Sequence, residues 1–183
     1  FLEFVVGGFD KFVKDTMGPT AVKELPFIVP YLGSLFLFFA VSNLIGLLGF
    51  RSPTTDLDTT LAWALITFFM IYYAGVKKKG MGMFKELLEP IPLLLPLNII
   101  GELAKPISLS FRPFGNILGG SVIMALLYQF LGFVSTSLTG INIPFGQLII
   151  PVPLHLYFDI FAGILQAFIF IMLTMVFVSN ATE

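Results

Sequence analysis

Residues 105–120 read KPISLSFRPFGNILGG and place a lone arginine, Arg112, inside one of the most apolar parts of the chain. Between Lys105 and Glu183 the only charged residues are Arg112 and Asp159. An arginine at bilayer depth costs about 3 kcal/mol on insertion scales, so we expect it to have a function. At about 100° per residue, seven positions fall within one third of the circumference of a helix here. They are Gly101, Lys105, Ser108, Arg112, Gly115, Asn116 and Gly119, and we call them the Arg112 stripe.

Two prolines predict the shape of this helix. Pro106 and Pro113 are seven residues apart and lie on the side away from Arg112. Each removes a backbone donor and crowds the carbonyl four residues earlier, so the helix bends away from them. The small, polar Arg112 stripe would then lie on the concave side, where another helix can approach closely. A helix broken at Pro113 would not have this shape.

The composition is that of a membrane protein. Of the 183 residues, 57% are hydrophobic, 22 are Phe and only 11% are charged, against roughly 25% charged in a soluble domain. The net charge of −1 gives no indication of nucleic-acid binding. The absence of cysteine excludes disulfides and thiolate chemistry, and a single histidine excludes a histidine-rich metal centre. Because the chain starts with Phe1 rather than Met, we expect a segment before it.

The predicted fold is an all-α integral membrane protein with a single membrane domain. An amphipathic segment, 1–24, is expected in the membrane interface, and the uncharged run 27–50 and the shorter run 59–76 are expected to span the bilayer. Residues 91–134 and 142–181 predict two long helices. Each is about 55 Å long at 1.5 Å per residue, too long to stand upright, so we expect a steeply tilted hairpin. Ordinary spans of about 20 residues with a break are the alternative.

Charge asymmetry predicts the orientation. The lysine-rich loop 77–89 and the basic segment before the first span lie two crossings apart. By the positive-inside rule both face the cytoplasm, which places the turn 51–58 outside.

The second long helix carries its own polar seam. His155, Asp159, Ala162, Gly163 and Gln166 share one face. A hairpin of the two helices would therefore present an arginine on one seam and the chain's only intramembrane carboxylate on the other.

The motif SLSFRPFGN at 108–116 resembles the a subunit of F-type ATP synthases, in which this motif surrounds the arginine that faces the rotor ring. Further similarity lies at SNLIGL (42–47), SPTTDLDTTL (52–61), KKG (78–80) and LQAFIFIMLT (165–174). The motifs occur in family order and cover essentially the whole chain, which we identify as similar to the bacterial type. Members of the family carry one more membrane helix before the position of residue 1, so the resemblance implies a transmembrane helix there in this protein too.

The resemblance implies roles for individual residues. Arg112 would face the rotor, with Gln166 as its partner across the long helices and Asn116 as its neighbour. An aqueous path for the ion would pass the remaining candidates, which are Asn43, Asp56, Glu102, Ser108, Ser121, His155 and Asp159.

The chain departs from a common bacterial pattern in the region of this path. That pattern has a glutamate nine residues after the arginine and a histidine seven before the glutamine, where this chain has Ser121 and Asp159. The carboxylate has thus moved between helices. Gly46 stands where some members have aspartate, and Pro113 replaces the usual leucine.

The implied function is that of a non-catalytic stator subunit with two ion half-channels, coupling H⁺ or Na⁺ translocation to rotation and ATP synthesis. The implied partners are the c-ring, b-type peripheral stalk subunits and lipid of a bacterial plasma membrane, with no cofactor, metal or nucleic acid. One alternative is a stand-alone ion channel or secondary transporter, which no inverted repeat supports. Another is a membrane-embedded enzyme using His155 and Asp159, which lacks a nucleophile.

Overall fold

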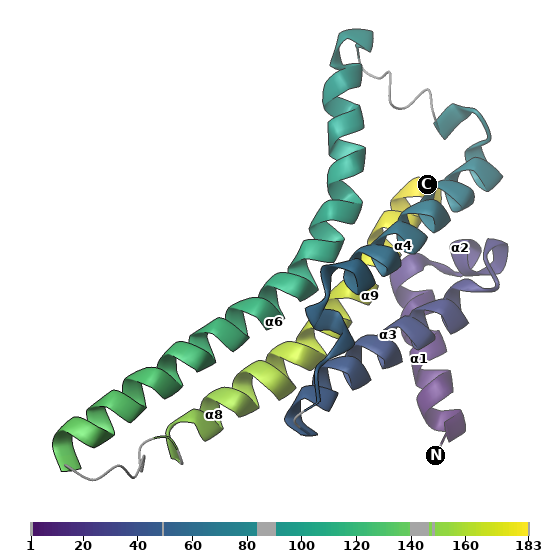
Figure 1. Ribbon diagram of the computed structural model, residues 1–183. Coiled ribbons are helices and arrows are strands. Elements are labelled where there is room, and N and C mark those ends of the chain that lie inside the picture. The colour runs from purple at the N-terminus through teal and green to yellow at the C-terminus, as the bar shows by residue number, and fades with distance from the viewer. Residues whose placement is uncertain (1, 49, 84–90, 140–146, 148, 183) are drawn as a thin grey trace.

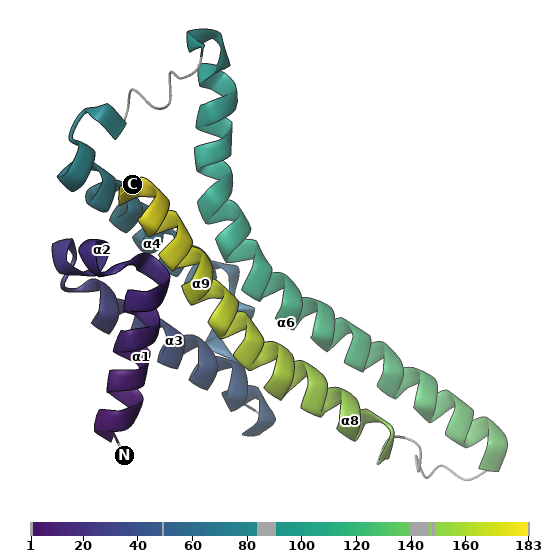
Figure 2. The same ribbon diagram turned by 180° about the vertical axis from the view of Figure 1, so that it is seen from behind.

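The computed structural model describes residues 2–48, 50–83, 91–139, 147 and 149–182, and the regular structure within them is helical, without strands. The chain starts with α1 (Leu2–Met17) and α2 (Pro19–Glu24). The predicted segment 1–24 is therefore interrupted at Gly18, whose φ of 82° favours glycine, before Pro19 begins the next helix. The second half of α1 buries Val13 and Met17 against α9 and α3, where the helices cross (Figure 2).

The first predicted span ends earlier than expected. Helix α3 covers Ile28–Leu44 and is followed by a 3₁₀ turn, η1 (Ile45–Leu48), so the prediction of one span over 27–50 was too long. Contacts at the end of α3, where Ser42 and Asn43 are buried, explain the change. The Ser42 carbonyl accepts from Ser52 in the turn 51–58, which we call the outer turn, and the Asn43 side chain donates to the Gly163 carbonyl of α9. The outer turn contains η2 (Pro53–Thr55).

The second predicted span is longer than expected. Helix α4 runs over Leu57–Lys79 rather than 59–76, and its last turn contains Lys77, Lys78 and Lys79. Lysines there are favourable next to the negative end of the helix dipole. The Lys77 Nζ donates to the Glu24 carbonyl at 2.7 Å, which ties the end of α4 to the end of α2.

The first long helix is continuous. After η3 (Pro92–Leu94), α6 runs over Leu95–Thr139, 45 residues, so it continues five residues beyond the predicted end at 134. At 1.5 Å per residue it is about 67 Å long, roughly twice the thickness of the hydrocarbon core. Pro106 and Pro113 lie inside the helix and are buried, while Arg112 is exposed. The helix bends in its first half with the concave side away from α4 and α9 (Figure 1), as the prolines predict.

The second long helix returns alongside the first. It consists of α8 (Pro151–His155), a π-helical segment η4 (Leu156–Ala162) and α9 (Gly163–Thr182). The predicted helix started at 142, and positions 142–146 and 148 lie outside the described residues. The two arms form an antiparallel hairpin (Figure 1).

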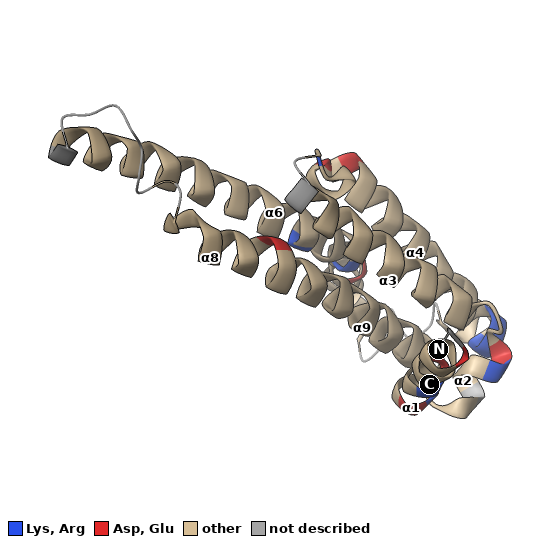
Figure 3. Ribbon diagram, turned by 90° about the horizontal axis from the view of Figure 1, so that it is seen from below, with Lys and Arg blue, Asp and Glu red and all other residues tan. Residues whose placement is uncertain are grey.

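Helix α9 is the centre of the bundle, because α3, α4, α1 and α6 all pack against it. Its buried residues Phe170, Ile171, Met175 and Val178 form the core together with apolar side chains of α3 and α4. Three helical segments are long and apolar enough to cross a membrane: Leu57–Lys79, Pro92–Ser137 and Pro151–Thr182. Ile28–Leu44 is a shorter apolar helix. The chain is thus an all-α integral membrane protein, with most charges outside the long arms (Figure 3).

Candidate ion pathway

A cavity of about 200 Å³ lies between the two arms of the hairpin, on the side of the outer turn. This volume holds several water molecules. We call it the outer cavity. Its polar lining comprises Asn43, Ser52, Asn116, Ser121, His155, Asp159 and Gln166, with Gly46, Gly120 and Gly163 among the small residues. It therefore brings together seven polar side chains from α3, the outer turn and both arms of the hairpin.

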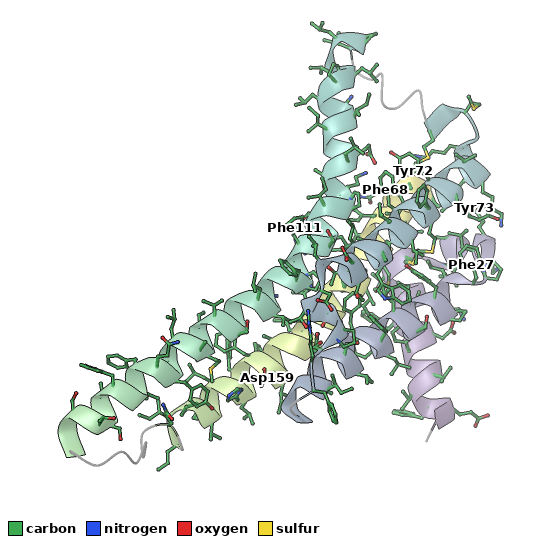
Figure 4. The ribbon with its side chains drawn as sticks, in the orientation of Figure 1. Phe27, Phe68, Tyr72, Tyr73, Phe111 and Asp159 are labelled. Carbon is green, nitrogen blue, oxygen red and sulfur yellow. The ribbon has the colours of Figure 1, made fainter. Side chains whose placement is uncertain are left out.

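Asp159 and His155 form a pair at this cavity. The His155 Nδ1 lies 2.9 Å from the Asp159 Oδ2, and both side chains are partly exposed. They belong to α8 and η4 and are four residues apart, a spacing that makes two side chains neighbours on a helix surface. The other ring nitrogen, Nε2, lies 3.2 Å from the hydroxyl of Tyr128 on α6. Figure 4 shows Asp159 on this arm.

A hydrogen bond between Asn116 and Gln166 joins the two arms at a position closer to Arg112 along α6 than Tyr128 is. The Asn116 Nδ2 donates to the Gln166 Oε1 at 2.7 Å. Gln166 is 2% exposed, and its Nε2 has no hydrogen-bond partner among the described residues. A buried amide donor without a partner costs about 1–3 kcal/mol. Because Gln166 lines the outer cavity, water there or a group of a partner subunit can accept this hydrogen bond.

A chain of hydrogen bonds anchors the outer turn to the hairpin. The Ser52 Oγ donates to the Ser42 carbonyl at 2.6 Å, and the Thr54 Oγ1 donates to the Asn43 Oδ1 at 2.8 Å. The Asn43 Nδ2 in turn donates to the Gly163 carbonyl at 2.8 Å. The hydroxyls of Ser52 and Thr54 and both amide atoms of Asn43 are buried. Asn43 therefore connects α3, the outer turn and the junction between η4 and α9.

A second cavity, of about 510 Å³, lies at the opposite end of the bundle, near the lysines of α4. We call it the inner cavity. Its lining includes Tyr72, Met83, Asn98, Glu102 and Lys105. The Lys105 Nζ lies 2.5 Å from the Glu102 Oε1 and 5.7 Å from the centre of the Phe177 ring, a cation–π distance. The hydroxyl of Tyr72, which lies on α4, donates to the Glu102 Oε2 on α6 at 3.3 Å.

Arg112 lies between the two cavities along α6. It comes seven residues after Lys105 of the inner cavity and four residues before Asn116 of the outer cavity. It lines neither, is exposed, and forms no hydrogen bond or ion pair with any residue that the structure describes. Its neighbour Phe111 is 52% exposed and projects on the side of α6 away from α4 and α9 (Figure 4). The arginine thus points out of the isolated subunit.

The comparison with known proteins decides the family. The family model described as ATP synthase A chain matches residues 1–179. The chain belongs to this family. It is also 37% identical to the "ATP synthase subunit a, sodium ion specific" of Propionigenium modestum over 198 aligned residues, covering 99% of this chain and 62% of the relative. The family is the non-catalytic a subunit of the membrane sector of F-type ATP synthase.

The structure places the candidate ion-pathway residues in two groups. The outer cavity collects Asn43, Asn116, Ser121, His155, Asp159 and Gln166, and the inner cavity contains Glu102. Ser108 and Asp56 line neither cavity. Ser108 is exposed on α6, and Asp56 forms an exposed ion pair with Arg51. Asp159 pairs with His155 rather than with Arg112.

Sequence reasoning missed two tyrosines. Tyr72 donates to the Glu102 carboxylate, and Tyr128 contacts His155, which is the partner of Asp159. The signal for Tyr128 was present in the antiparallel hairpin. Tyr128 is twelve residues beyond Asn116, and His155 is eleven residues before Gln166, so pairing Asn116 with Gln166 brings Tyr128 to His155. Within the described residues, no group of three or more His, Cys, Asp or Glu side chains could hold a metal ion.

Proposed function

We propose that this chain is the stator a subunit of an ATP synthase, in which the two cavities form ion half-channels and Arg112 faces the rotor. The ion enters one cavity, transfers to a carboxylate of the c-ring, and leaves through the other cavity after the ring has turned. Because the chain spans about 62% of its relative's length, the activity of the whole subunit is part of this proposal.

The observation that carries the proposal is the placement of Arg112 between two separate polar cavities. The outer cavity reaches Asn116 and the inner cavity reaches Lys105, with one exposed arginine between them on α6. A continuous pore would let ions leak down their gradient. Two half-length cavities that open on opposite ends, with a cation between them, allow passage only by way of a moving carrier.

Arginine suits the position between the cavities. A nearby cation stabilises the ionised form of a carboxyl group, so Arg112 favours release of the ion from each arriving rotor carboxylate. Its charge also repels a free cation that would cross directly. The guanidinium stays protonated even in apolar surroundings, which a lysine would not ensure. The membrane potential supplies about 2.3 kcal/mol per charge per 100 mV to drive the turn.

The face of α6 that carries Arg112 suits a ring of helices. Phe111, the residue before Arg112, projects on the concave side of the bend (Figure 4), and Ile107 and Leu118 are further exposed apolar side chains of this part of α6. We propose that the c-ring covers this face. We assign b-type peripheral stalk subunits and lipid to the remaining apolar surface.

The transported ion in this proposal is H⁺ or Na⁺. The name of the Propionigenium modestum relative specifies sodium, which favours Na⁺. The carboxylate and the hydroxyl and amide oxygens of the outer cavity are ligands suited to a hard cation.

We propose that the chain lies in a bacterial plasma membrane with the inner cavity and loop 77–89 on the cytoplasmic side. The lysines of α4 support this orientation. The turn 51–58 would then lie outside, at the end of the bundle that holds the outer cavity. In this orientation α2, whose last residue Glu24 accepts from Lys77, meets the cytoplasmic interface.

The test is Arg112→Ala in the assembled complex, reconstituted into vesicles. We expect loss of ATP synthesis driven by an imposed ion gradient, with normal subunit assembly. Arg51→Ala is a matched control, because Arg51 is the only other arginine and lies exposed in the outer turn. Full coupled synthesis by Arg112→Ala would refute the proposal.

A further inference from the structure

A chain of hydrogen bonds connects the two arms of the hairpin beside the outer cavity. The Tyr128 hydroxyl on α6 lies 3.2 Å from His155 Nε2, and His155 Nδ1 lies 2.9 Å from Asp159 Oδ2. The rings of Tyr128 and His155 also pack against each other, with centroids 6.0 Å apart. A second contact holds this part of α6, because the Gln147 Nε2 donates to the Tyr128 carbonyl at 2.6 Å.

The order of these contacts fixes how the His155 ring is oriented. A carboxylate can only accept a hydrogen bond, so His155 donates to Asp159 through Nδ1. A tyrosine hydroxyl can donate or accept, so Tyr128 pairs with Nε2 whichever tautomer the ring adopts. Tyr128 therefore holds the imidazole in the orientation in which Nδ1 faces Asp159.

Asp159 is the one acidic residue among the described residues that line the outer cavity. The position of its carboxylate depends on the imidazole, because His155 is its hydrogen-bond partner. His155 is packed against α6, which has no charged residue between Arg112 and Thr139. Helix α3, packed against η4, has no charged residue either. The nearest charges of the outer turn, Arg51 and Asp56, pair with each other.

We propose that Tyr128 is a positioning residue for ion entry, which holds the His155 ring so that its Nδ1 donates to Asp159 and keeps this carboxylate at the wall of the outer cavity. This inference rests on the proposed function, since it concerns the supply of the ion to the rotor. Tyr128 acts through His155 and does not bind the ion itself. The role is specific to a chain that has its carboxylate on the second arm, because Ser121 occupies the alternative position on α6.

The experiment compares Tyr128→Phe with wild type in purified complexes reconstituted into vesicles. ATP synthesis is measured at a fixed imposed driving force, as a function of the outside Na⁺ concentration. Tyr157→Phe is the control, because Tyr157 is an exposed tyrosine of η4 whose hydroxyl has no partner among the described residues. The amount of this subunit in each complex reports whether the variant assembles.

The loss of one hydrogen bond predicts a roughly 2- to 10-fold higher Na⁺ concentration at half-maximal rate for Tyr128→Phe. If H⁺ is the transported ion, the rate itself falls by the same factor.

A double-mutant cycle separates positioning from packing. If Tyr128 acts through the imidazole, adding Tyr128→Phe to His155→Ala should not change the ion dependence further. Additive effects, or a Tyr128→Phe complex that matches wild type in its ion dependence, would overturn the inference. Failure of the proposed function is distinguishable, because then the wild-type complex itself would show no synthesis driven by the ion gradient.

Discussion

Gly163→Ala is the substitution whose cost can be worked most directly from the structure. A Cβ at Gly163 would lie 2.9 Å from the Cβ of Asn43, closer than real Cβ atoms approach. Neither atom belongs to a flexible chain end, so α3 and α9 must move apart. Overpacking of this kind costs about 1–3 kcal/mol. The movement also weakens the two buried hydrogen bonds of Asn43, to the Gly163 carbonyl and from Thr54, each worth about 1 kcal/mol.

One contribution has the opposite sign. Alanine is preferred over glycine inside a helix by about 1 kcal/mol, so we expect a net destabilisation of roughly 1–3 kcal/mol. The measurement is the unfolding of the subunit in detergent micelles as SDS is added, followed by circular dichroism. Gly8→Ala on α1 is the matched control, because nothing lies within 4 Å of the added Cβ there, and it should be neutral or stabilising. If Gly163→Ala unfolds at the same SDS fraction as Gly8→Ala, α3 and α9 do not approach as described.

Two further predictions concern the orientation and the carboxylate of the outer cavity. Cysteines introduced at Thr55 and at Lys79 should react with a membrane-impermeant thiol reagent from opposite sides, Lys79 from the cytoplasm; reaction of both from one side would exclude the proposed orientation. Asp159→Asn should slow ion transport severely, measured as gradient-driven ATP synthesis, without uncoupling it, because the outer cavity loses its charge but Arg112 still separates the half-channels. Adding Ser121→Glu should restore part of the rate, since Ser121 lines the same cavity. A wild-type rate in Asp159→Asn would show that its carboxylate is only structural.

The features that follow from local periodicity were predictable along α6. Arg112, Pro106 and Pro113 lie within eight residues of one another, and the helical repeat alone separates the buried prolines from the exposed arginine. Long uncharged runs identify membrane helices because length and composition are local properties. The ends of helices were less predictable. The end of α3 at Leu44 depends on the partners of Ser42 and Asn43, which come from the outer turn and α9.

Composition, hydrophobic runs and helical spacing were thus sufficient for the class of protein, the long hairpin and the exposed arginine, because each depends on residues near one another in the chain. The cavities depend on contacts across 27 to 120 positions, such as Tyr128 with His155 and Asn43 with Gly163. A one-residue shift of α6 along α9 would turn Asn116 by about 100° away from Gln166, yet would leave every local pattern unchanged. Only the packing of α6, α9 and α3 against each other selects the register, and the register determines which polar side chains share a cavity.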